Sequence, residues 1–251
     1  MAGTTIQLCG RYVVEVEGDR VETRLPGRQG RLLFAYLALN RDRTVSRSEL
    51  VEAVWPGELP RDPSDALAAV LSKVRTALRG DYLVGRGELQ LLLPPGSRID
   101  VERALASAHE AESACSLQDW GRAWGASLSA QFVARRTLLG EYEAPWIDDW
   151  RGTLDDILQR ARESYATACL GLGGTELASA ERAARQLVRS APLRESATAL
   201  LMQVLERQGN AAEALLVYES LRKRLRDELG VAPAEPLQAA YRRLLGAPAS
   251  G

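Results

Sequence analysis

The 251-residue chain lacks the side chains that most metal sites and many enzymes depend on: it has one histidine, His109, and three cysteines. Cys9, Cys115 and Cys169 lie far apart and form no C-x-x-C motif. Neither a zinc site nor a disulfide framework is predicted, and free buried thiols are expected. His109 has neither a second histidine nor a nucleophile pattern beside it. We therefore expect no catalytic residue, no metal and no cofactor.

Long hydrophobic runs are also missing. No apolar stretch approaches the roughly 18 residues of a membrane span. The first residues, Met1-Ala2-Gly3-Thr4-Thr5, lack the basic and apolar regions of a secretory signal. The sequence thus predicts a cytoplasmic protein with no membrane partner.

An excess of basic charge is missing as well, since the formal net charge is −1. A basic footprint is the usual first sign of nucleic-acid binding, so binding would require the basic residues to be clustered. Residues 28–47 form one candidate cluster, with five arginines and the single acid Asp42.

The composition that is present, 46% hydrophobic and 26% charged, is typical of a globular protein. Residues 4–25 alternate apolar and polar side chains and predict short strands with a turn at Gly18-Asp19. Helical periodicity then predicts three helices, at about 29–39, 46–55 and 63–79.

Capping residues mark two of these helices. Ser46, with Glu49 three positions later, forms a capping-box pattern at the start of the second helix. Asp62 can cap the third helix, Pro63 suits its first position, and Gly80 is expected to end it. Residues 81–84 and 88–91 then predict a hairpin around Gly85-Arg86-Gly87. Strands, three helices and a final hairpin make a winged helix.

Pro94-Pro95-Gly96-Ser97 indicates a domain boundary. We expect an α+β winged helix over residues 1–98 and an all-α, tetratricopeptide-like domain over residues 99–251. An offset of 34 residues, which aligns Ala180 with Ala214 and Leu187 with Leu221, is the tetratricopeptide period. The expected helices of this second domain lie at about 101–116, 118–131, 145–172, 175–190, 193–208, 210–229 and 235–245.

Several motifs resemble the antibiotic regulatory protein (SARP) family. In the first half these are GRLLFAYLALN at 30–40, VSRSELVEAVWP at 45–56 and LSKVRTAL at 71–78. In the second half they are APW at 144–146, APLRES at 191–196, RQGNAAEA at 207–214 and LRDELGVAP at 225–233. The resemblance implies an OmpR-like DNA-binding domain followed by a bacterial transcriptional activator domain.

This resemblance makes the third helix a recognition helix for the major groove of promoter DNA. Ser72 and Thr76 are expected to reach bases or phosphates, and Lys73, Arg75 and Arg79 to reach phosphates. Arg86, at the hairpin turn, is expected in a minor groove. Arg47 completes the expected DNA-binding set.

The resemblance also implies RNA polymerase as a partner, through Glu58 and Arg61 in the loop between the second and third helices. A homodimer, or side-by-side copies on DNA, is expected with it. One alternative stays open: a protein-interaction module of the same family with weak or lost DNA binding. The near-neutral charge and the alanines Ala68 and Ala69 on the recognition helix favour this alternative.

Overall fold

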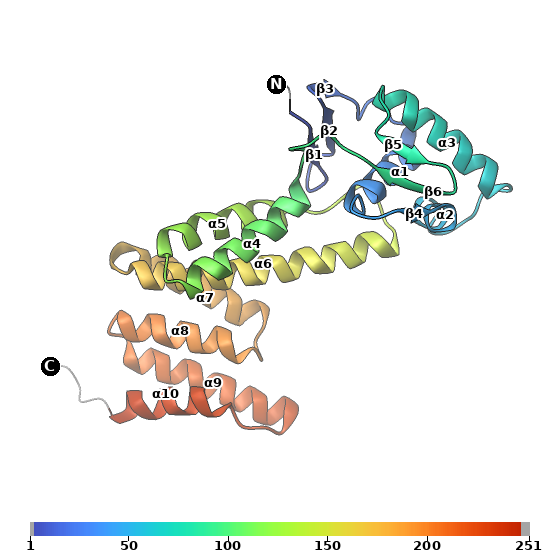
Figure 1. Ribbon diagram of the computed structural model, residues 1–251. Helices are drawn as coiled ribbons and strands as arrows, with labels where there is room; N and C mark the ends of the chain where they lie inside the picture. Colours follow the sequence, from blue (N-terminus) through green and yellow to red (C-terminus); the bar gives the residue numbers. More distant parts are fainter. Residues whose placement is uncertain (1–2, 247–251) are drawn as a thin grey trace. The chain divides into compact units, whose positions relative to one another are not determined.

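The computed structural model describes residues 3–246 and divides the chain into two compact units (Figure 1). The first unit combines Met1–Leu105 with Phe132–Asp155. The second unit combines Ala106–Gln131 with Asp156–Gly251. A small mixed α and β region thus precedes a helical remainder, as the sequence predicts.

Two small sheets belong to the first unit. The first has the order β3-β2-β1-β7 and is antiparallel except for β7, which runs parallel to β1. The second has the antiparallel order β4-β6-β5. The strands are β1 (Thr5–Gln7), β2 (Val13–Val16), β3 (Asp19–Arg20), β4 (Val45–Ser46), β5 (Leu83–Gly85), β6 (Glu88–Leu91) and β7 (Arg98–Ile99). The predicted hairpin is confirmed as β5 and β6, whereas β4 and β7 were not predicted.

Three helices accompany these sheets: α1 (Gly27–Leu39), α2 (Arg47–Val54) and α3 (Pro63–Leu78). They pack on one another and bury their apolar faces. The largest fully buried side chains of this core include Phe34, Leu37, Leu50, Leu67 and Leu71.

The predicted caps at the starts of α2 and α3 are confirmed. The Ser46 hydroxyl accepts the Glu49 amide at 3.2 Å, and the Asp62 carboxylate accepts the Asp65 amide at 3.0 Å. The end of α3 differs from the prediction, because Arg79, with φ 55°, takes the left-handed conformation expected of a glycine. A Cβ at Gly80 would lie 2.6 Å from the Tyr82 ring, so a larger residue there would require the ring to move.

A segment from the second half of the sequence joins the first unit. Cys9 and Leu138 form an isolated antiparallel bridge. Trp146 donates from Nε1 to the Ala53 carbonyl at 3.0 Å, and its ring meets Tyr36 edge to face at 5.1 Å between centroids. The sequence did not predict this association.

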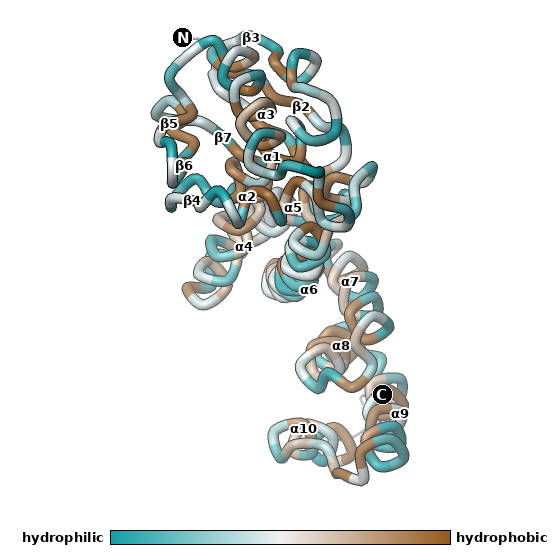
Figure 2. Tube along the Cα trace, turned by 90° about the vertical axis from the view of Figure 1, so that its right-hand side faces the viewer, coloured by the Kyte–Doolittle hydropathy of each residue, from teal (hydrophilic) through white to brown (hydrophobic). Residues whose placement is uncertain are grey.

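The remaining helices confirm the predicted helical segments. They are α4 (Asp100–Ser116), α5 (Trp120–Ala134), α6 (Pro145–Leu172), α7 (Leu177–Ser190), α8 (Glu195–Arg207), α9 (Ala211–Leu229) and α10 (Glu235–Gly246), with a 3-10 turn at Gly174–Glu176. In the second unit α7 packs on α8, and α8 packs on α9. Figure 2 shows α8 and α9 with hydrophobic and hydrophilic stretches in turn, as amphipathic helices require. Within residues 3–246, no helix is both long and apolar enough to cross a membrane.

Candidate nucleic-acid interface

The outward side of α3 carries three of the expected DNA-binding residues. Ser72, Lys73 and Thr76 are exposed, whereas the neighbouring Leu71 and Val74 are buried. The Thr76 hydroxyl donates to the Ser72 carbonyl at 3.0 Å, which leaves its oxygen lone pairs free to accept. In the part of the chain that the structure describes, Lys73 has no ion-pair partner. This side of the helix therefore offers hydroxyl groups and one free cation.

Arg75 lies beside these residues, but carbonyl groups occupy its guanidinium. It donates to the Leu83 carbonyl at 3.3 Å and to the Gly85 carbonyl at 2.9 Å. Both acceptors belong to β5, so Arg75 connects α3 to the hairpin. Its geometry is that of a residue that positions the hairpin.

Arg79, at the end of α3, faces an acid. Its guanidinium lies 3.7 Å from the Asp19 carboxylate, which also accepts two hydrogen bonds from Arg24. The hydrogen bond from Arg24 lowers the pKa of Asp19, so the negative charge that faces Arg79 is stabilised. Asp19 carries one negative charge for two arginines, so the charge of Arg79 is only partly compensated within the chain.

The hairpin turn projects Arg86, which is exposed and has no ion-pair partner among the described residues. Gly85 precedes it with φ 92°, and a Cβ at that position would lie 1.9 Å from the Glu88 carbonyl oxygen. Only glycine fits such a close backbone approach. We call Ser72, Lys73, Thr76 and Arg86 together the recognition face.

Arg47 and the neighbouring arginines make local contacts within the first unit. Arg47 donates to the Ser64 carbonyl at 3.2 Å and so ties α2 to α3. Arg41 pairs with Glu102 at 2.6 Å, and Arg43 pairs with Glu49. Two of the five arginines between residues 28 and 47 are thus paired with acids, whereas the other three bond uncharged oxygens and keep their charge.

The loop between α2 and α3 exposes Glu58 and Arg61, and Leu59 is 60% exposed. Beside it lies a cavity of about 500 Å3, lined by Trp55, Leu59 and Trp146 among others and rimmed by Glu49, Glu52 and Asp149. Sequence reasoning missed this cavity. The APW motif at 144–146 could have pointed to it, because this motif contains Trp146, one of the residues that line the cavity.

No group of three or more histidine, cysteine or acidic residues within the described chain is placed to hold a metal ion. The three cysteines are free, as expected; Cys9 and Cys169 are buried and Cys115 is half-buried. Burial raises the pKa of the Cys169 thiol to about 11, which keeps it protonated and unreactive near neutral pH.

Comparison with known proteins agrees with this arrangement. Residues 99–245 match the family model of the bacterial transcriptional activator domain. The regulatory protein AfsR of Streptomyces griseus is 34% identical over 229 residues, which cover 87% of this chain and 22% of AfsR. The transcriptional regulator RedD of Streptomyces coelicolor is 30% identical over 241 residues, which cover 86% of this chain and 63% of RedD.

The fold resembles that of a solved structure. EmbR of Mycobacterium tuberculosis, in complex with a low-affinity phosphopeptide, superimposes with a TM-score of 0.82 at 20% sequence identity. The match covers 96% of this chain and 65% of the EmbR chain. The chain spans less than a quarter of AfsR and about two thirds of EmbR.

Proposed function

Because the chain belongs to the family of the bacterial transcriptional activator domain, we propose that it is a DNA-binding transcriptional activator whose N-terminal region is a winged helix. Membership in this family agrees with the SARP-type resemblance of the sequence motifs. Relatives carry the names of transcriptional regulators, which supports a regulatory role and no enzymatic activity. Promoter DNA in bacteria lies in the cytoplasm, so this proposal includes the expected location.

The recognition face is the observation that carries this proposal. A helix fits the major groove of B-DNA, where Ser72 and Thr76 meet base edges and Lys73 meets a phosphate. Arg86, at the tip of the hairpin, reaches the adjacent minor groove. Arg75 then acts as a positioning residue that fixes the hairpin beside α3. Arg79 and Arg47 serve mainly to hold the surrounding structure.

The test is retention of duplex DNA by the purified chain at increasing salt. Phosphate contacts release counterions, so affinity is expected to fall linearly with salt on a logarithmic scale. Fragments of promoter DNA should be retained more strongly than random duplex of the same length. Equal, salt-independent retention of all fragments would contradict the proposal.

For the second half of the chain we propose a tetratricopeptide-like arrangement with a boundary near residue 98. The starts of α7 and α9, at Leu177 and Ala211, lie 34 residues apart, which is the tetratricopeptide period. Such stacked helix pairs present a surface to protein partners. Two copies bound side by side on repeated DNA sites complete this model.

Contact with RNA polymerase is proposed for the loop between α2 and α3. Glu58 and Arg61 are exposed, and the neighbouring cavity adds an apolar surface with an acidic rim. Replacing both residues with alanine is expected to preserve DNA affinity and to lower transcription in a reconstituted assay. Full activity with intact binding would place the polymerase contact elsewhere.

A protein-interaction module with weak DNA affinity is the second candidate. It is favoured by the low charge of α3, where Ala68 and Ala69 are exposed next to a single lysine. DNA retention separates the two candidates, because only the activator requires binding at physiological salt.

A further inference from the structure

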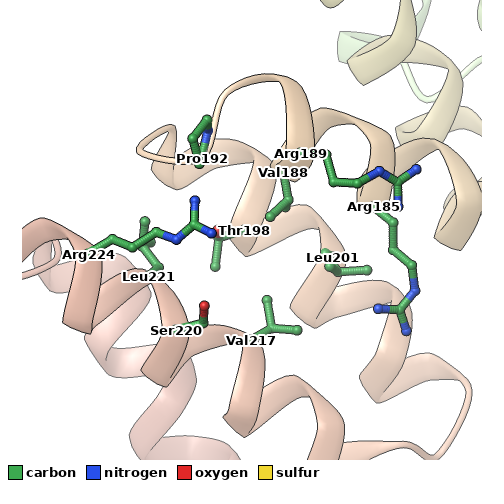
Figure 3. A pocket seen from close by; sticks show the side chains of 10 residues that line it. All are labelled: Arg185, Val188, Arg189, Pro192, Thr198, Leu201, Val217, Ser220, Leu221 and Arg224. Carbon is green, nitrogen blue, oxygen red and sulfur yellow. The ribbon is translucent and has the colours of Figure 1, made fainter.

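The second unit contains a cavity of about 290 Å3 between α7, α8 and α9 (Figure 3). Three arginines line it and no acidic residue does. Figure 3 shows Arg224 on one side and Arg185 and Arg189 on the other, with Val188 and Val217 between them. We call this cavity the arginine groove.

The charges of the arginine groove are only partly compensated. Arg185 donates to Glu213 at 2.6 Å and to Glu181 at 2.8 Å, so its charge is balanced. Arg189 and Arg224 are exposed, and neither has an ion-pair partner within residues 3–246. Two arginines, each able to bind a carboxylate in a bidentate manner, therefore line the same groove without an acidic partner.

The floor of the arginine groove is apolar and well supported. Val188 and Val217 are half-buried and pack against the core cluster that contains Leu201 and Leu221. Thr198, only 1% exposed, also lines the groove. The groove thus offers apolar contact below and anion recognition at the sides.

The neighbouring cavity between α8 and α10 has a different set of charged residues in its lining. It is lined by Glu195 and Glu206 as well as Arg243, and Arg243 pairs with Glu206 at 2.7 Å. Its charges are therefore mixed, and its one cation is paired with an acid. The arginine groove differs from this cavity because its lining carries unpaired arginines and no acidic residue.

We propose that the arginine groove binds an extended acidic segment of a partner protein in which acidic and aliphatic side chains alternate. Aliphatic side chains cover the valine floor, which gains from apolar burial. Arginine side chains are long, so Arg189 and Arg224 can reach carboxylates from opposite sides. A DNA backbone fits less well, because it carries no apolar group to cover that floor. This site lies outside the recognition face and goes beyond the proposed function.

The test uses the full chain and a fluorescent octapeptide of alternating glutamate and leucine. The neutral control is the peptide of alternating glutamine and leucine. The double variant Arg189→Gln/Arg224→Gln is expected to weaken binding of the acidic peptide by about tenfold or more, since charge-assisted hydrogen bonds are lost. The matched control Arg222→Gln, on the same helix but paired with Glu219 at 2.7 Å, should change affinity by less than about twofold. Val217→Thr should weaken the acidic peptide by roughly threefold, because the floor becomes polar.

Three results would overturn the proposal. The first is equal binding of the acidic and neutral peptides, and the second is unchanged binding by the double variant with its melting temperature preserved. The third is loss of duplex DNA retention in the double variant, which would make the groove a nucleic-acid contact. DNA retention by the unmodified chain is measured in parallel, so failure of this proposal is distinguishable from failure of the proposed function.

Discussion

The recognition face of the first unit and the arginine groove of the second unit each have two cations without an ion-pair partner among the described residues, but the surfaces around these cations differ: hydroxyl groups on the recognition face and valine side chains in the groove. On the recognition face, Lys73 and Arg86 are free, while the neighbouring Arg75 and Arg79 are occupied by carbonyl groups and by Asp19. In the arginine groove, Arg189 and Arg224 stand free above an apolar floor. A count of basic residues along a sequence therefore does not locate a binding surface; the local partners of each cation decide it.

The largest effect on DNA affinity is expected from the two cations of the recognition face that have no ion-pair partner among the described residues. Replacing Lys73 and Arg86 together with alanine should reduce DNA affinity by about a hundredfold, because two charge-assisted contacts are lost. The logarithmic dependence of affinity on salt should become shallower by about two. Fluorescence anisotropy with a labelled duplex at several salt concentrations measures both quantities.

The variant Arg189→Gln/Arg224→Gln is the matched control for that experiment, since it removes the same amount of charge from the second unit. Its DNA affinity should stay within about twofold of the unmodified chain, because the proposal assigns the phosphate contacts to the recognition face. If both double variants lost DNA affinity equally, the distinction between the two surfaces would be wrong.

The next largest effect is expected on the preference of the protein for particular DNA sequences. Ser72 and Thr76 are exposed on α3 and carry the hydroxyl groups suited to base edges. Replacing either with alanine should cost roughly 1–3 kcal/mol at the preferred site and little at other sites. Binding to a randomised duplex library, compared between variants, measures this. Lys73→Ala, in contrast, should weaken binding to all DNA sequences about equally. A changed sequence preference in that variant would mean that Lys73 contacts a base and that the base contacts have been assigned to the wrong residues.

The regular elements could be predicted from the sequence because their signals are local. Helix α6 (Pro145–Leu172) coincides with the range expected from its periodic apolar residues, and the capping residues Ser46 and Asp62 act as predicted. Partners distant in sequence were not predictable. Pairing of Arg41 with Glu102 spans 61 residues, and the hydrogen bond from Trp146 to Ala53 spans 93.

The expected site residues show the same division. Exposure of Ser72, Lys73 and Thr76 followed from the helical period of the buried residues around them. The orientation of Arg79 did not, because its backbone takes the left-handed conformation that the sequence assigns to Gly80. The attachment of Arg75 to β5 requires the hairpin to be in place.

Loss of the contacts between Arg75 and β5 should have a moderate effect. Arg75→Gln removes the charged donor to the Leu83 and Gly85 carbonyls, so the hairpin is held less firmly and DNA affinity should fall by about fivefold. The salt dependence should change little, because Arg75 binds carbonyl groups and not phosphates. Hydrogen exchange of the Arg86 and Gly87 amides reports the loosened turn. A salt dependence shallower by one would instead identify Arg75 as a phosphate contact.

The smallest effect concerns the ion pair of Arg43 and Glu49, which compensates charge within the first unit. The hydrogen bond from Arg43 lowers the pKa of Glu49 below its ordinary value of 4.5. The unfolded chain therefore binds the proton more readily, and this stabilisation is present above pH 4.5 and lost as the pH falls through the lowered pKa. The Arg43 and Glu49 side chains are 46% and 31% exposed, so Glu49→Gln should cost less than about 1 kcal/mol at neutral pH. Urea unfolding at several pH values should show the two proteins converging in acid, with Glu52→Gln on the same helix as control. Parallel curves for Glu49→Gln and the unmodified chain would mean that the pair adds no proton-linked stability.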